Sequence, residues 1–144
     1  MPARDLYHQV VRRALQQDGW SITHDPYTLS VGGRNVFVDL GAERLLAASK
    51  GSDLIAVEIK AFSGPSELAS LEQALGQYVL YRSLLRKIEP ERRLVLAITQ
   101  ITYDTTFAEP IARPVLDELR LDLLTFDPGK ERVVKWIHST DTGN

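Results

Sequence analysis

The sequence contains no cysteine, and this absence removes several classes of function at once. Without thiols the chain forms no disulfide and no thiolate metal site, which fits a reducing compartment. The chain also lacks an apolar run long enough to span a membrane, and its first residues, MPARDLYHQ, contain no apolar core of the signal-peptide type. We therefore expect a soluble, cytoplasmic protein.

The chain has no excess of positive charge either. The 144 residues include 17 lysines and arginines against 19 aspartates and glutamates, which gives a formal net charge of −2. This balance offers no general affinity for nucleic acid, so any DNA contact must use a local patch. A solvated helix end explains the main basic cluster as well as contact with phosphate does. Its members are Arg82, Arg86, Lys87, Arg92 and Arg93.

The common catalytic motifs are also missing. The sequence has no GxSxG nucleophile motif, no phosphate-binding P-loop, no HExxH zinc motif and no GxGxxG dinucleotide motif. Repeats, linkers and low-complexity tracts are absent too. A chain of this length buries roughly two thirds of its unfolded surface. We therefore expect a single domain over 1–144, in which the polar segment 138–144 forms a loose tail.

Hydrophobic periodicity predicts the order of helices and strands. Apolar spacings of three and four residues predict helices at 4–17, 66–88 and 107–119, the last interrupted near its two prolines. Apolar runs and alternating segments predict strands at 20–23, 28–31, 35–40, 54–60, 94–99, 121–126 and 132–137. Gly32 and Gly33 predict a hairpin turn. The segment 42–49 suits a helix or a strand, and we favour a strand that pairs with its successor.

The element order predicts the fold class. One helix is followed by several strands, a long helix, a strand, a further helix and two final strands. Such an order is typical of an α/β sandwich, in which helices flank a central mixed β-sheet.

The predicted strand 54–60, read LIAVEIK, ends in two opposite charges. Because strand side chains alternate, Glu58 and Lys60 point to one face while the apolar residues between and before them point to the other. The preceding apolar segment, 35–40, carries a single carboxylate, Asp39, near its end. Ionised groups rarely occur in buried strands unless they are paired or bind a metal. Two strand ends therefore bring acidic groups together, with a lysine beside them.

These residue types suit phosphodiester hydrolysis. Asp39 and Glu58 offer hard oxygen ligands for Mg²⁺, which proteins hold with one or two carboxylates together with phosphate and water. The backbone carbonyl of Ile59 would add a further oxygen, and Lys60 would orient the attacking water or neutralise charge on the phosphate. The alternative is an internal Glu58 and Lys60 ion pair with Asp39 capping a turn. The residues alone leave both interpretations open.

The predicted helix 66–88 adds polar residues close to its apolar stripe. Gln73 and Gln77 are four residues apart and share one face, and Tyr81 follows a further turn along. Such residues either border the stripe or belong to a site, and periodicity does not distinguish the two.

Two resemblances extend this interpretation. Asp39, followed after 18 residues by Glu58, Ile59 and Lys60, resembles the PD-(D/E)xK nuclease superfamily. Longer segments are similar to the XisH family, described as fdxN element excision controlling factors of cyanobacteria. These segments are DLYHQVVRRALQQDGWSITHDP, VFVDLGAERLLAASKGSDLIAVEIKAF, LEQALGQYVLYRSLL and LTFDP. The resemblance implies a restriction-endonuclease-like fold.

The resemblance also implies roles for single residues. Asp39 and Glu58 would bind Mg²⁺ or Mn²⁺, Lys60 would be the catalytic lysine, and Gln73 would support it. Two features depart from the superfamily pattern. Val38 stands where relatives have a proline before the aspartate, and the first helix has no inward-facing glutamate.

Three functions follow for the whole chain. The first is a Mg²⁺-dependent endonuclease that processes DNA during site-specific excision, with a homodimer as one arrangement for a two-stranded substrate. The second is a non-catalytic accessory factor that binds DNA or a small XisI-type protein and so controls a site-specific recombinase. The third is a scaffold that contacts proteins alone.

Overall fold

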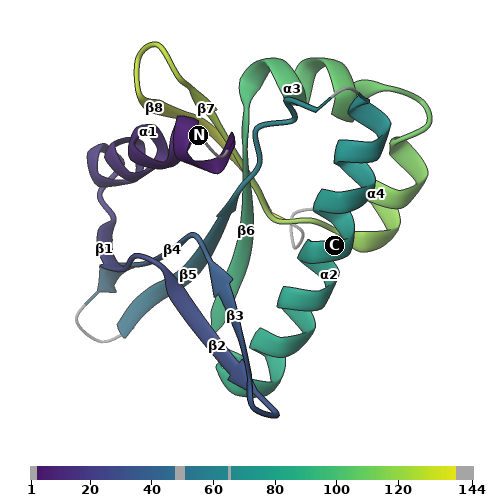
Figure 1. Ribbon diagram of the computed structural model, residues 1–144. Helices are drawn as coiled ribbons and strands as arrows, with labels where there is room; N and C mark the ends of the chain where they lie inside the picture. Colours follow the sequence, from purple (N-terminus) through teal and green to yellow (C-terminus); the bar gives the residue numbers. More distant parts are fainter. Residues whose placement is uncertain (1–2, 48–50, 65, 139–144) are drawn as a thin grey trace.

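The computed structural model describes residues 3–47, 51–64 and 66–138 and has a central mixed sheet of six strands. The helical elements are α1 (Ala3–Gln17), α2 (Glu67–Ile88), α3 (Gln100–Thr105), the 3₁₀ turn η1 (Thr106–Ala108) and α4 (Arg113–Leu119). The strands are β1 (Ser21–His24), β2 (Tyr27–Val31), β3 (Arg34–Val38), β4 (Leu40–Ala47), β5 (Gly51–Ile59), β6 (Arg92–Thr99), β7 (Leu123–Asp127) and β8 (Arg132–Ile137). The predicted mixed α/β class is confirmed (Figure 1).

The six-stranded sheet has the order β1-β4-β5-β6-β7-β8. β5, β6 and β7 run parallel to one another, whereas the outer pairings are antiparallel. β5 and β6 occupy the middle of the sheet, and five consecutive residues of β5, 55–59, are buried. A strand that is covered on both faces requires apolar side chains at nearly every position, which explains the run LIAV.

Helices cover both faces of this sheet (Figure 1). On one face, Leu15 of α1 belongs to the same buried cluster as Val57 of β5 and Phe126 of β7. On the other face, Tyr78 of α2 is clustered with Leu96 of β6. Because Val57 faces α1, strand alternation turns its neighbours 56 and 58 toward α2. The alternation predicted for this strand is therefore confirmed.

The ambiguous segment 42–49 is a strand over its described part. β4 pairs with β5 in antiparallel register, with Leu40 opposite Val57 and Ala42 opposite Ile55. The predicted start of the central strand at residue 54 is wrong, because β5 begins at Gly51. Pairing with β4 supplies ladder hydrogen bonds to polar residues that would otherwise form a turn.

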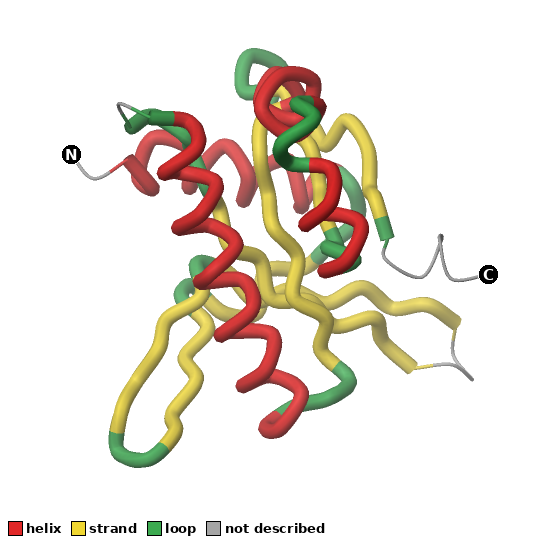
Figure 2. Tube along the Cα trace, turned by 90° about the vertical axis from the view of Figure 1, so that its right-hand side faces the viewer, coloured by secondary structure: helices red, strands yellow, loops and turns green. Residues whose placement is uncertain are grey.

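The predicted hairpin at Gly32 and Gly33 is confirmed, and both glycines have positive φ angles of 57° and 80°. β2 and β3 form a separate two-stranded sheet, which projects beside α2 as an arm with a green turn at its tip in Figure 2. The predicted strand 35–40 is wrong at its end. β3 stops at Val38, and the chain bends at Asp39 before β4 begins.

The predicted helix 107–119 is also wrong in part. Only Arg113–Leu119 is α-helical within it, and the preceding residues form η1 and a turn. An additional helix, α3, follows β6 directly and is capped by Thr99, whose Oγ1 accepts a hydrogen bond from the backbone N–H of Thr102 at 3.1 Å. Its sequence, QITYDT, has three β-branched residues. Because such residues disfavour helix, helix propensity does not predict this element.

Helix α2 lies close to its predicted bounds. Ser66 caps its first turn by accepting a hydrogen bond from the backbone N–H of Ala69 at 3.2 Å. None of the described helices is long and apolar enough to cross a membrane. His138 is described, but the rest of the predicted tail, 139–144, lies outside the described residues.

Candidate functional site

The end of β5 positions the two opposite charges that the sequence singles out. Glu58 lies within the strand, and Lys60 follows it and donates its backbone N–H to the carbonyl of Ala97 at 3.1 Å. The side chains share a face, and Lys60 Nζ lies 3.5 Å from Glu58 Oε2. Glu58 is 7% exposed, and the Lys60 side chain is 22% exposed. The pair is therefore largely buried but remains open to solvent at the lysine.

Asp39 reaches the same place from the bend between β3 and β4. Because Leu40 is paired with Val57, its neighbour Asp39 lies next to Glu58 across the two strands. Oδ2 of Asp39 accepts a hydrogen bond from the backbone N–H of Ile59 at 2.8 Å, and the residue is 4% exposed. The structure thus brings together the predicted residues Asp39, Glu58 and Lys60. The predicted ligand role of the Ile59 carbonyl stays a prediction.

The electrostatics of Glu58 are unusual for a carboxylate. Burial raises the pKa of Glu58 to about 7, and the negative charge of Asp39 adds to the rise, while Lys60 opposes it. Oε1 of Glu58 is buried and has no hydrogen-bond partner among the described residues. A buried oxygen without a partner is costly, so a cation or a hydrogen-bond donor bound here would stabilise the site.

A cavity of about 420 Å³ opens above these residues. Its walls come from β3 and from α2, and its floor comes from the end of β5. On the α2 side, Gln77 has a buried Oε1 without a partner among the described residues. Burial raises the pKa of Tyr81, and the charges of Glu58 and Asp39 raise it further. The lining residues are Asn35, Val36, Phe37, Asp39, Glu58, Ile59, Lys60, Gln77 and Tyr81.

Gln73, the helix residue predicted to support catalysis, lies one turn from Gln77. It lines a neighbouring hollow of about 210 Å³, which shares Ile59 and Lys60 with the main cavity. Its catalytic role stays a prediction. The sequence shows that Gln73, Gln77 and Tyr81 share a helix face, but the register of α2 over the sheet decides which of them lie beside the carboxylates. The sequence thus named Gln77 and Tyr81 as residues that border the apolar stripe or belong to a site, but it assigned a role to Gln73 alone.

The basic cluster lies elsewhere and is mostly occupied by internal contacts. Arg92 is 7% exposed and donates to the carbonyl of Ile55 at 2.9 Å and to Glu89 Oε1 at 2.8 Å. Arg93 forms an ion pair with Asp53 at 3.2 Å. Contact with phosphate was one of the two explanations of this cluster. Only its exposed members on α2 remain available for such contact. These are Arg86 and Lys87.

The donor set at the cavity fits a hard divalent cation. Within the described ranges, no three His, Asp or Glu side chains are placed so that they could hold a metal ion together, so a closed cage of protein ligands is not formed there. Mg²⁺ does not require one, because it usually keeps several waters and takes one or two carboxylates. Asp39 and Glu58 supply these, and the unpartnered oxygens of Glu58 and Gln77 are the acceptors that a cation and its waters would satisfy.

Fold and site together define a class of protein. It is a mixed α/β protein in which the central strand presents two carboxylates and a lysine to a solvent-open cavity. The sequence matches the XisH protein family over residues 1–134. The chain therefore belongs to the XisH family, as the resemblance predicted.

Two solved structures are similar to this chain along almost its whole length. An XisH family protein from Nostoc punctiforme PCC 73102 is 41% identical, with a TM-score of 0.84, and the match covers 93% of this chain and 100% of that one. An fdxN element excision controlling factor protein from Anabaena variabilis is also 41% identical, with a TM-score of 0.84 and coverage of 94% and 100%. No curated protein matches the sequence.

Proposed function

We propose that this XisH-family protein is an endonuclease of the PD-(D/E)xK type, which uses Mg²⁺ or Mn²⁺ to hydrolyse phosphodiester bonds in DNA during site-specific excision. In this proposal the mixed sheet and its flanking helices form a restriction-endonuclease-like fold. The observation that carries the proposal is the contact of 3.5 Å between Lys60 Nζ and Glu58 Oε2, beside Asp39, in one cavity. The description of the Anabaena variabilis relative supports the connection with excision of a DNA element.

The alternative of a purely structural ion pair explains less of the geometry. An internal pair would be expected to satisfy both carboxylate oxygens, because burying a charge is stabilising only when its hydrogen bonds are complete. Here Glu58 Oε1 has no partner among the described residues, and burial together with Asp39 raises the pKa of Glu58. A carboxyl group with a raised pKa at the wall of a cavity is typical of functional sites.

The residues have distinct roles in this proposal. Asp39 and Glu58 would hold the cation, with the backbone carbonyl of Ile59 as a further ligand. When bound, the cation supplies positive charge to the phosphate and to the attacking water. The ammonium of Lys60 donates hydrogen bonds to the water or to a phosphate oxygen, and its contact with Glu58 holds it at the cavity. Gln73, in the adjoining hollow, would support the position of Lys60.

The first test combines metal binding with cleavage. Titration of Mg²⁺ and Mn²⁺ by calorimetry should give binding heat for the wild type and none for Glu58→Gln. Cleavage of linear and branched DNA in the same samples should fall about 10²- to 10³-fold in Lys60→Met, since the lysine stabilises charge in the transition state. Glu72→Gln and Lys130→Met are matched controls, because both side chains are exposed and neither lines the cavity.

The assay should be run with and without a small XisI-type protein and a site-specific recombinase, the partners implied by the family resemblance. Metal binding lost in Glu58→Gln together with metal-dependent cutting would support the nuclease. Absence of binding heat and of cutting under all conditions would overturn it. An accessory factor that controls a recombinase without cutting would then remain, a role that agrees with the Anabaena variabilis relative being an excision controlling factor.

A further inference from the structure

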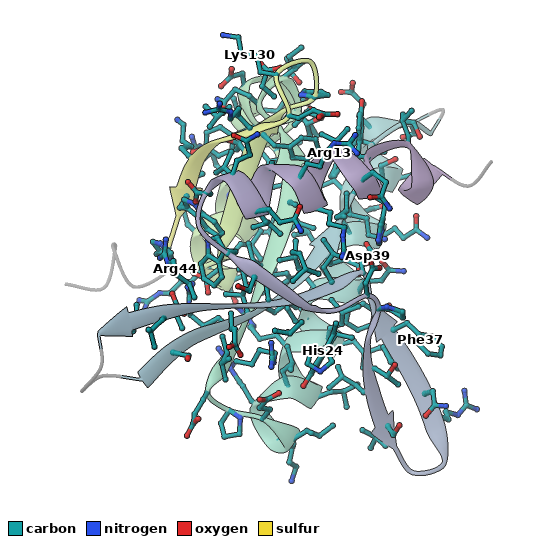
Figure 3. The ribbon with its side chains drawn as sticks, turned by 90° about the vertical axis from the view of Figure 1, so that its left-hand side faces the viewer. Arg13, His24, Phe37, Asp39, Arg44 and Lys130 are labelled. Atoms are coloured by element: carbon teal, nitrogen blue, oxygen red, sulfur yellow. The ribbon has the colours of Figure 1, made fainter. Side chains whose placement is uncertain are left out.

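One wall of the site cavity carries an aromatic ring that metal-dependent hydrolysis does not require. Phe37 lies on β3 two residues before Asp39, lines the same cavity and is 50% exposed (Figure 3). No ring contact among the described residues involves it, and its cross-strand neighbour is the smaller, exposed Thr28. The ring of Phe37 therefore presents an exposed apolar face at the wall of this cavity.

A second aromatic ring, from helix α2, lines the same cavity. Tyr81 of α2 is partly buried and lines the cavity, and burial and the two carboxylates raise its pKa. The phenol therefore stays neutral at physiological pH and keeps its proton as a hydrogen-bond donor. Its hydroxyl makes no hydrogen bond within the part of the chain that the structure describes.

Asn35 adds a polar group on the same strand face as Phe37. Its Oδ1 accepts a hydrogen bond from Ser30 Oγ at 2.6 Å, which fixes the side chain. Its amide N–H groups have no partner among the described residues, so they can donate to an acceptor in the cavity. The cavity thus combines two rings with an oriented amide, and its volume of about 420 Å³ lies within the range of roughly 300–1,000 Å³ typical of small-molecule sites.

The charge of the cavity limits how DNA can be held there. Among the described residues that line it, Lys60 is the single cation, and it faces the carboxylates of Asp39 and Glu58. Without a bound metal ion, attraction to phosphate, which dominates the affinity of most DNA-binding proteins, is therefore weak at this site. Stacking of a base on an aromatic ring is the contribution that does not depend on charge.

We infer that Phe37, Tyr81 and Asn35 form a base clamp that holds one unpaired nucleotide of a DNA substrate beside the metal site. This inference rests on the proposed nuclease function and adds its substrate class, which is DNA with an unpaired nucleotide next to the cleaved bond. Stacked base pairs hide the faces of their bases, whereas an unpaired base exposes a face to Phe37 and an edge to Asn35.

The test measures binding without metal, so that its outcome is independent of cleavage. Fluorescence anisotropy in EDTA should show that the wild type binds a single-stranded oligonucleotide more tightly than the duplex of the same sequence. Phe37→Ala should lose roughly 5- to 150-fold in affinity for the single strand, which corresponds to one stacked base. Phe37→Trp should bind the single strand about as tightly as the wild type, because tryptophan also offers an aromatic face. Val31→Ala, at an exposed apolar position on the same hairpin, should leave the affinity unchanged.

A second measurement locates the base. An abasic site moved along the oligonucleotide should weaken binding to the wild type at one position and cause no further loss in Phe37→Ala, because the ring and the base share one contact. Binding to the wild type should also depend weakly on salt. The clamp would be overturned if the abasic site weakened binding to Phe37→Ala as much as it weakens binding to the wild type. It would also be overturned if Phe37→Ala kept the affinity of the wild type, or if the wild type bound single strand and duplex equally well. Mg²⁺ titration of Phe37→Ala should match the wild type, which separates this result from failure of the metal site.

Discussion

The backbone N–H of Ile59 donates to Oδ2 of Asp39 at 2.8 Å, although the two residues are 20 positions apart in the sequence. β3 ends just before Asp39 and β4 begins just after it, so this bond fixes the bend against the end of β5. It also places the carboxylate next to Glu58. Asp39 therefore has a structural function in addition to its place in the site.

Substitution of Asp39 should separate these two functions. Asp39→Ala leaves the buried N–H of Ile59 unpaired and should lower the free energy of unfolding by about 1–3 kcal/mol. Asp39→Asn keeps an acceptor oxygen and should cost less, yet both variants should weaken Mg²⁺ binding because both lose the charge. Removing the charge of Asp39 also relieves its repulsion with ionised Glu58, which would stabilise the variants and mask the loss of the hydrogen bond. Unfolding in urea should therefore be measured at pH 5.5, where Glu58 is mostly protonated. Equal destabilisation by Ala and Asn would show that the bond does not hold the bend.

Tyr78 tests how α2 is attached to the sheet. Its hydroxyl donates to the carbonyl of Leu94 at 3.0 Å and accepts from the backbone N–H of Asp122 at 3.0 Å, and the residue is 1% exposed. Tyr78→Phe leaves both backbone groups without this partner and should lower the free energy of unfolding by about 1–3 kcal/mol. Tyr103→Phe is the control, since its hydroxyl makes no hydrogen bond to the described residues. Comparable losses in the two variants would contradict the bridging role.

The sequence predicts those parts of the site that depend on local alternation. Glu58 and Lys60 share a face because they are two residues apart on one strand, and no other element is needed to place them. The apolar run around them predicts a central strand, because only burial on both faces requires it. Asp39 was also found from sequence, since it follows an apolar run.

The parts that could not be predicted depend on contacts between distant elements. Gln73 and Gln77 are equivalent by periodicity, and only the position of α2 over the sheet brings Gln77 to the carboxylates. Arg92 resembles an exposed basic residue in the sequence, whereas the structure buries it against Tyr27 and Glu89. Helix α3 was missed because its cap and tertiary packing outweigh its poor helix propensity.

Arg92 should therefore behave as a structural residue rather than as a DNA contact. Its guanidinium lies 4.6 Å from the centre of the Tyr27 ring and donates to Glu89 and to the carbonyl of Ile55. Arg92→Met leaves these acceptors unsatisfied and should lower the free energy of unfolding by about 2 kcal/mol or more.

The exposed Arg86 provides the comparison. Arg86→Met should stay within about 0.5 kcal/mol of the wild type, as surface substitutions usually do. Chemical unfolding of both variants gives the result directly. A fully stable Arg92→Met with reduced affinity for DNA would assign Arg92 to phosphate binding instead.

The raised pKa of Glu58 should make stability depend on pH in a direction opposite to that of most carboxylates. Its pKa is about 7 in the folded protein against an ordinary value of 4.5, because burial and Asp39 disfavour its charge. Between these values the folded state binds the proton and the unfolded state does not, so the free energy of unfolding falls as pH rises, by at most about 1.4 kcal/mol per pH unit.

Glu58→Gln removes this titration. The variant should lack the decline between pH 4.5 and 7 and should be more stable than the wild type at pH 8, whereas Glu72→Gln should follow the wild type. Addition of Mg²⁺ at pH 8 should stabilise the wild type and not Glu58→Gln, because ligands that bind only the folded state raise its stability. EDTA should reverse the gain. If the wild type and Glu58→Gln showed parallel pH profiles, the carboxylate of Glu58 would be solvated and its pKa would not be raised. The proposed metal site at Glu58 would then have to be abandoned.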